Sequence, residues 1–354
     1  MIQFIKLIIS FIILISIYGC NSTDDQSNRL ERTHAIVNIG SSDQFLVGNL
    51  EGVHITSLSN FDLSNGITYS NSNSDLSANV VKSISINEAK TAVLLGTSDG
   101  LEVASLSEKI SLNNFKTVDL TSVTEYDINN VTATSFLAED SVLAGIYGRG
   151  LLLAQIDENG IVSNKILYNM NKSLKLILDI EVYNNIVMVS SKNNGFFIGK
   201  YSTENKNLSS LKKISLGTNS AVHDAKYDPA SQLVGIATLR NLVFGKINSD
   251  GAFTKLRTYN VNTLDTTLKN IGFKQYRKIA FNSTATKVAV AESGGRYIVA
   301  DIDNSTGVIS NIKLYTVNET SKGISLDNIF SLQFYKDEYI IIGNETSTVT
   351  VQKI

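Results

Sequence analysis

A hairpin-like stretch recurs seven times along the chain, and no other sequence feature constrains the fold as strongly. The clearest copy is residues 92–107, AVLLGTSDGLEVASLS. Its apolar first half ends at Gly96, a short polar turn closes on Gly100, and a second, mostly apolar run starts at Leu101. Apolar runs of this length joined by a short turn with glycine are typical of β-hairpins. Each copy therefore predicts two antiparallel strands joined by a tight turn.

The spacing of the copies predicts how the hairpins assemble. They begin about 45 to 55 residues apart, which is the period of propeller blades with four strands each. The seven copies are residues 45–59, 92–107, 142–157, 186–202, 233–248, 287–303 and 339–354. Candidate inner strands precede all seven, at 35–39, 83–86, 132–136, 174–182, 224–227, 278–281 and 329–334, and candidate outer strands follow six of them, such as 115–120, 211–216 and 309–315. We therefore predict an all-β fold, a seven-bladed β-propeller of four-stranded antiparallel blades over residues 34–354.

The first strand of each hairpin is a continuous apolar run rather than an alternating one. Such a run indicates burial on both faces, as expected when each sheet lies between two neighbouring blades. The sequence ends with the seventh hairpin at Ile354, so we expect the last blade to have three strands. The alternative is a fourth strand supplied by residues 28–33, which we disfavour because Glu31 and Arg32 suit a strand poorly.

Four short segments connect the repeat to known propellers. Residues 95–101, LGTSDGL, are similar to a "GT-x-x-GL" strand turn, and residues 147–151, YGRGL, are a second example. Residues 227–229 and 281–283 look like the "F-S-P-D-G" turn. On these segments the region 34–354 resembles seven-bladed propellers of the Trp-Asp-repeat, lactonase-like and two-component-regulator types. It departs from the first of them because the chain has no tryptophan.

The N-terminus has the pattern of a secretory leader, with Lys6 before the apolar run 7–17, LIISFIILISI. A positive start, a short apolar run and a small residue at the cut site make a signal peptide. Residues 17–20, IYGC, resemble the lipobox of bacterial lipoproteins, although Tyr18 is bulkier than is usual there. The resemblance implies cleavage before Cys20, a diacylglycerol thioether on its sulfur, and a fatty acyl group such as palmitate on the new amino terminus.

Cys20 is the only cysteine in the chain, so it cannot form an intramolecular disulfide. Two or three acyl chains give stable membrane anchoring. We therefore expect residues 1–19 to be a lipoprotein signal peptide and the polar, aperiodic residues 20–33 to be a lipidated flexible tether. The competing interpretations are a plain secreted protein and an uncleaved membrane anchor, which is disfavoured because the apolar run is shorter than about 18 residues.

Composition and missing motifs exclude several classes of function. A formal net charge of -2 on 354 residues predicts no bulk affinity for nucleic acid. The sequence has no P-loop, no G-x-S-x-G, no H-E-x-x-H and no Cys/His metal spacing, and its three histidines are scattered. We therefore expect no metal site, no cofactor and no catalysis, and we expect a monomer.

The candidate binding residues lie where propellers usually bind their ligands. By fold analogy, this is the face that carries the turns inside the hairpins and the connections into the inner strands. On it we place six candidates for ligand or partner binding: Arg149, Lys192, His223, Arg240, Arg277 and Arg296. The long connection 262–275 makes blades five and six the preferred site, and 121–130 is a second long connection on the same face.

Four residues, His34, Lys82, His223 and Arg277, occupy equivalent positions just before inner strands. Basic groups near a channel mouth can receive an anionic group. Alternatively, they hydrogen-bond the inner strands of neighbouring blades to each other. A carboxylate such as Asp224 beside His223 would raise the basicity of the imidazole, but adjacent residues of a strand point to opposite faces, so we do not expect the two to touch.

The leading hypothesis is a lipid-anchored propeller that binds a protein or glycan partner, without catalysis, at the bacterial cell envelope. We expect it on the outer membrane or the cell surface. One alternative is a lactonase-like hydrolase with His223, Asp224 and Arg277 as catalytic residues. The other is an assembly factor in outer-membrane biogenesis, as quinoprotein-like lipoprotein propellers are.

Overall fold

The computed structural model describes residues 34–39, 43–57, 66–118, 130–157, 162–169, 174–209, 211–217, 221–260, 275–316, 328–344 and 349–354. All of their regular secondary structure is β-strand. No helix among these residues is long and apolar enough to cross a membrane. The predictions for Cys20, for the leader 1–19 and for the tether 20–33 concern residues outside the described ranges, and most of the two long connections also lies outside them.

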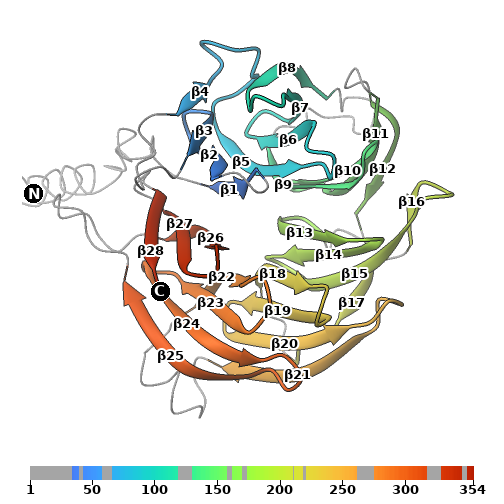
Figure 1. Cartoon of the computed structure of the whole chain (residues 1–354). Helices are drawn as coiled ribbons and strands as arrows, with labels where there is room; N and C mark the ends of the chain where they lie inside the picture. Colours follow the sequence, from blue (N-terminus) through green and yellow to red (C-terminus); the bar gives the residue numbers. More distant parts are fainter. Residues whose placement is uncertain are drawn as a thin grey trace, which may run out of the picture.

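The strands form seven separate antiparallel sheets arranged in a ring (Figure 1). Blade 1 contains β1 (Ala35–Asn38), β2 (Gln44–Gly48), β3 (Val53–Ser57) and β4 (Ile67–Tyr69); blade 2 contains β5 (Val81–Ile86), β6 (Ala92–Thr97), β7 (Leu101–Leu106) and β8 (Leu112–Thr117); blade 3 contains β9 (Val131–Ala138), β10 (Ser141–Ile146), β11 (Gly150–Ile156) and β12 (Val162–Tyr168); blade 4 contains β13 (Ile177–Tyr183), β14 (Ile186–Ser191), β15 (Gly195–Ser202), β16 (Asn207–Leu208) and β17 (Lys212–Ile214); blade 5 contains β18 (Val222–Asp228), β19 (Leu233–Thr238), β20 (Asn241–Ile247) and β21 (Phe253–Asn260); blade 6 contains β22 (Tyr276–Phe281), β23 (Lys287–Glu292), β24 (Arg296–Asp303) and β25 (Val308–Thr316); and blade 7 contains β26 (Ile329–Tyr335), β27 (Tyr339–Asn344) and β28 (Val349–Lys353). The predicted seven-bladed architecture is confirmed, and so is a last blade of three strands.

The second strand of each blade carries the core. Every residue of β10, β14 and β19 is buried, and the other second strands are buried except at their first residue. Their side chains point alternately into the two flanking blade interfaces, so both faces of the sheet are removed from water. This is the burial predicted from the continuous apolar runs.

Small residues in these second strands let neighbouring blades approach closely. A Cβ on Gly96 would lie 2.9 Å from the Cγ1 atom of Val131, and a Cβ on Gly145 would lie 2.8 Å from the Cβ atom of Ile177. Val131 and Ile177 are the first residues of the next blade's inner strand. Glycine at this place in the hairpin therefore sets the distance between blades.

The inner strands contain a repeated irregularity that positions the candidate site. In β5, β9, β13, β18, β22 and β26 the pairing with the second strand skips one residue near the start of the strand. The skipped residues are Lys82, Thr132, Leu178, His223, Arg277 and Phe330. A bulge of this kind leaves its extra residue outside the ladder and redirects its side chain.

The outer strands differ most from the sequence prediction. The outer strand of blade 2 spans residues 112–117 instead of 115–120, because it begins directly after a tight turn between Ser107 and Ser111. In blade 4 the predicted strand 211–216 is present as the shorter β17, and a second short strand, β16, precedes it and also pairs with β15. Leu208 and Leu211 both pack against Gly199, which has no side chain to exclude them. The pairing with β15 is interrupted between these two buried leucines.

The ring closes between blade 1 and blade 7 at a contact we call the seam. Phe45 and Tyr335 meet edge to face at 5.5 Å, His34 lies 5.3 Å from the Phe330 ring, and Lys336 pairs with an aspartate of blade 1 at 2.9 Å. The seam has only four buried apolar residues in the described part of the chain, against nine to thirteen in the other apolar clusters. The proposed fourth strand from residues 28–33 falls outside the described residues.

Candidate functional site

The hairpin turns and the starts of the inner strands lie on one face of the ring, which we call the turn face. In five blades a backbone N–H of the turn donates to the carbonyl just before the inner strand of the same blade. These bonds join Ser98 to Val80, Tyr147 to Asn130, Lys192 to Leu176, Leu239 to Ala221 and Ser293 to Gln275, at 3.0, 3.0, 2.9, 2.9 and 3.4 Å. The placement that fold analogy suggested for these segments is therefore present in the structure.

Several bulge residues link one blade to the next. Lys82 Nζ donates to Asn130 Oδ1 at 2.6 Å, and Thr132 Oγ1 donates to the Ile177 carbonyl at 2.6 Å. Both acceptors belong to the chain that forms the following blade. Burial lowers the pKa of the Lys82 ammonium. The geometry thus gives Lys82 the inter-blade role that was the alternative to anion binding.

His223 makes the same kind of link between blades 5 and 6. Its Nδ1–H donates to the Tyr276 carbonyl at 2.7 Å, and the residue is only 4% exposed. Burial, together with the nearby charges of Arg277, Lys278 and Lys192, lowers the pKa of His223 to about 4, although the carbonyl hydrogen bond opposes this. At neutral pH the imidazole is therefore uncharged, with Nε2 as its acceptor nitrogen.

The neighbouring Asp224 has different partners. Its Oδ2 accepts the Ile279 N–H at 2.9 Å, and its Oδ1 lies 3.3 Å from Lys278 Nζ. His223 is therefore oriented by a backbone carbonyl and not by a carboxylate. The structure does not join His223 and Asp224 into a catalytic pair, in agreement with their adjacent positions on the strand.

The remaining candidates lie at or beside the hairpin turns of four different blades. Arg296 pairs with the buried carboxylate of Glu292 within blade 6. Lys192 and Arg240 are exposed turn residues, and Arg149 is half-buried. Of the six candidates, three lie near one another: Lys192, His223 and Arg277. The charges of Lys192 and Arg277 both help to lower the pKa of the His223 imidazole.

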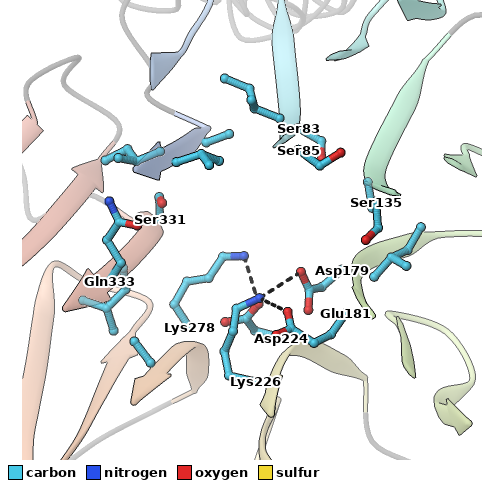
Figure 2. A pocket seen from close by; sticks show the side chains of 18 of the residues that line it. Ser83, Ser85, Ser135, Asp179, Glu181, Asp224, Lys226, Lys278, Ser331 and Gln333 are labelled. Carbon is cyan, nitrogen blue, oxygen red and sulfur yellow. Dashed lines mark hydrogen bonds and ion pairs between the residues drawn. The ribbon is translucent and has the colours of Figure 1, made fainter. Parts of the chain in front are cut away.

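A central channel with a volume of about 560 Å³ is lined by the inner strands of all seven blades. Alternate residues of the inner strands point into it, as the period of a strand requires. Figure 2 shows the polar ones: Ser83, Ser85, Ser135, Asp179, Glu181, Asp224, Lys226, Lys278, Ser331 and Gln333. Blades 4, 5 and 6 supply all the charges in this set, whereas blades 2, 3 and 7 supply hydroxyl and amide groups.

Ion pairs connect the charged wall across blade boundaries. Lys226 Nζ lies 2.7 Å from Glu181 Oε2 and 3.6 Å from Asp179 Oδ1, and Lys278 bridges to Asp224 (Figure 2). Burial would lower the pKa of Lys226, but the three carboxylates around it hold that pKa well above its usual value. Burial raises the pKa of Glu181, and Lys226 only partly offsets this. The network therefore ties blades 4, 5 and 6 together and holds one more carboxylate than ammonium groups.

The sequence carries a weak signal for this network. Asp179 and Glu181, and likewise Asp224 and Lys226, alternate with apolar residues on one strand. Charges at alternate positions of an inner strand indicate a polar, wet face. Nothing in the sequence shows that the partners, 45 and 54 residues apart, meet across blades.

The part of the chain that the structure describes contains no preformed metal-binding site. No group of three or more His, Cys, Asp or Glu side chains is placed to hold an ion there. The channel carboxylates are engaged with lysines and backbone N–H groups.

The geometry can be compared with known proteins. The β-propeller domain of Cps50 (Swd1) from Myceliophteria thermophila is similar with a TM-score of 0.65, over 92% of this chain and 96% of that chain, at 10% sequence identity. The chain is a seven-bladed β-propeller. Identity this low shows the fold alone, and no protein-family model and no curated protein matches the sequence.

Proposed function

We propose that this propeller is a non-catalytic binding module that recognises a protein or glycan partner with its turn face. The observation that carries the proposal is Tyr147, whose side chain is 56% exposed in the turn of blade 3. The turn is fixed on both sides, because Tyr147 N donates to the Asn130 carbonyl at 3.0 Å and Gly148 N donates to the Lys175 carbonyl at 2.5 Å. An exposed tyrosine on a backbone held in this way is the kind of residue that dominates binding interfaces, since its side chain has only two rotatable bonds and loses little entropy when it is buried.

Exposed cations on the same face add charge to this anchor. Lys192 and Arg240 project from the turns of blades 4 and 5. A surface that combines an aromatic anchor with basic residues favours a partner with acidic or anionic groups. Differences among the seven turns then supply specificity, because the strands beneath them are alike.

The experiment is capture of the partner from native envelope membranes by cross-linking, with the full chain and two tyrosine variants. We expect Tyr147→Ala to weaken capture of a defined partner by about 30-fold, the effect of losing about 2 kcal/mol of binding energy. Tyr183→Ala is the matched control, because Tyr183 is 38% exposed but lies at the β13–β14 turn on the opposite face. Equal capture by the wild type and Tyr147→Ala would overturn the proposal.

The nature of the captured partner separates the remaining hypotheses. An envelope protein of outer-membrane biogenesis supports the assembly-factor hypothesis, and a glycan or another protein supports a receptor-like module. The hydrolase hypothesis has less support, since Asp224 bonds to the Ile279 N–H and to Lys278 and not to His223.

We further propose that the module is anchored to the bacterial envelope, on the outer membrane or the cell surface, through a lipid on Cys20. The support is the leader and the lipobox-like residues 17–20. Metabolic labelling with a fatty acid tests it: label is expected on the wild type and absent from Cys20→Ser. Equal labelling of both would refute the anchor without affecting the proposed binding face.

A further inference from the structure

Three basic residues lie on the turn face where blades 4, 5 and 6 adjoin, close enough for the charges of two of them to act on the third. Lys192 lies in the β14–β15 turn, and His223 and Arg277 are the bulge residues of β18 and β22. The two bulges place their residues at the same level, because each follows the first residue of its inner strand. We call Lys192, His223 and Arg277 the basic cluster.

The described residues provide no negative charge to the basic cluster. Arg277 is half-buried, its Nε is shielded from solvent and has no hydrogen-bond partner, and burial alone lowers its pKa. Asp224, which follows His223 in the sequence, bonds to Ile279 N–H and to Lys278, so its carboxylate faces the channel. Guanidinium groups that are removed from water without a partner are costly, and a bound anion removes that cost.

We propose that the basic cluster binds one oxyanion group of the partner, a carboxylate, phosphate or sulfate, and that binding transfers a proton from solvent to Nε2 of His223. This inference rests on the proposed function and names the chemistry that its binding face recognises. Nδ1–H of His223 is held by the Tyr276 carbonyl at 2.7 Å, so Nε2 is the nitrogen available to an anion. Neutral Nε2 repels an anion as an acceptor, whereas protonated Nε2 donates a charge-assisted hydrogen bond to it.

The charges around His223 explain why the proton arrives with the ligand. Arg277 and Lys192 face it from blades 6 and 4, and Lys278 lies on the channel side, where Asp224 neutralises it. An anion between Arg277 and Lys192 cancels their repulsion of the imidazolium. If bound anion raises the pKa of His223 from about 4 to about 6, anion binding is about tenfold tighter at pH 5 than at pH 7 by linkage.

The test uses the full chain with labelled histidine rings, because only three histidines give signals. The probes are sulfate and trifluoroacetate, which stay ionised at every pH used, each compared with sodium chloride of equal ionic strength. We expect at least one probe to shift the His223 ring signals, to raise the His223 pKa from about 4 to about 6, and to bind about tenfold tighter at pH 5 than at pH 7. Response to sulfate alone indicates a phosphate- or sulfate-type group, and response to trifluoroacetate alone indicates a carboxylate.

Matched variants assign the effect to the cluster. Arg277→Gln and the exposed Lys192→Gln should each weaken anion binding by at least fivefold, and His223→Gln should abolish the pH dependence. Lys82→Gln changes the equivalent bulge residue of blade 2 and should bind anion as the wild type does. The inference is overturned if neither probe moves the His223 signals, or if affinity is equal at pH 5 and pH 7.

The outcome is separable from that of the proposed function. Loss of partner capture in Tyr147→Ala with no anion response from His223 would remove this inference and keep the binding face. Anion binding at His223 without any captured partner that depends on Tyr147 would keep this inference and remove the proposed binding face.

Discussion

Replacing Lys226 with methionine tests the charge network of the channel, since methionine keeps much of the side-chain length and removes the charge. Lys226 Nζ lies 2.7 Å from Glu181 Oε2 and 3.6 Å from Asp179 Oδ1. Breaking a buried pair by removing one partner costs about 3–5 kcal/mol, and exposed pairs contribute about 0–1 kcal/mol. The Lys226 side chain is 34% exposed. We therefore expect Lys226→Met to lower the free energy of unfolding by about 2 kcal/mol at pH 7, between the two limits.

A second ion pair in the chain offers a matched control. Lys206 Nζ lies 2.6 Å from Asp140 Oδ2, but these side chains are 45% and 50% exposed. Lys206→Met is the same chemical change on a bond of similar length. We expect it to lower the free energy of unfolding by less than about 0.5 kcal/mol, because water solvates the carboxylate that remains.

The assay is urea unfolding followed by far-UV circular dichroism, since the chain has no tryptophan. It is run at pH 7 and at pH 5. Without Lys226 the pKa of Glu181, already raised by burial, rises further. A carboxyl whose native pKa exceeds its unfolded pKa gains a proton on folding, so the penalty is present above the native pKa and fades as the pH falls. Equal losses for both variants at pH 7, or a Lys226→Met loss that does not shrink at pH 5, would refute the reasoning.

Three further predictions concern the turns, the seam and a buried acid. Gly150→Ala should lower the free energy of unfolding by about 3 kcal/mol, since φ of Gly150 is +129° and the new Cβ would lie 2.4 Å from an outer-strand carbonyl oxygen. Gly148→Ala, measured in the same urea assay, should lower it by about 1 kcal/mol, because φ of Gly148 is +74° and no atom lies within 4 Å of the new Cβ. Phe45→Ala should lower the free energy of unfolding by about 3–4 kcal/mol because Phe45 is 2% exposed, while Tyr335→Phe across the seam should lower it by about 1 kcal/mol or less. Equal losses for the two variants would contradict the inference that apolar burial holds the seam together. Burial raises the pKa of Glu102 above 4.5, so the free energy of unfolding should fall as the pH rises from about 4.5 through the raised native pKa. Glu102→Gln should remove that part of the pH dependence, measured by denaturation between pH 4 and 8.

The hairpin pattern was sufficient to predict the ring because burial and sequence coincide there. Strands such as β10 and β14 are buried on both faces, and continuous apolar runs express that directly. The sequence prediction places β8 three residues too late and makes β17 too long, because these outer strands are half-exposed and their boundaries depend on turns and packing instead of on hydrophobicity.

The candidate site was only partly predictable for a geometric reason. The equivalent positions of Lys82, His223 and Arg277 could be found by aligning repeats, because all three are bulge residues. Which hydrogen-bond partner each of them finds depends on contacts between blades, such as that of Lys82 with Asn130. The bond between Lys226 and Glu181 likewise joins two strands that no local pattern relates.

The seam sets where the ring opens. Its polar contacts, such as that between Asp43 and Lys336, join residues 293 positions apart, whereas most pairing in the ring is between consecutive strands. Closing so long a loop carries an entropic penalty that the small apolar cluster of the seam must offset. Amide hydrogen exchange should therefore be fastest at β1 and β28 among the strands of these two blades, through openings that leave the other blades folded. Both ends of the propeller lie at this joint, so tension applied to either end of the chain acts on its weakest blade-to-blade contact.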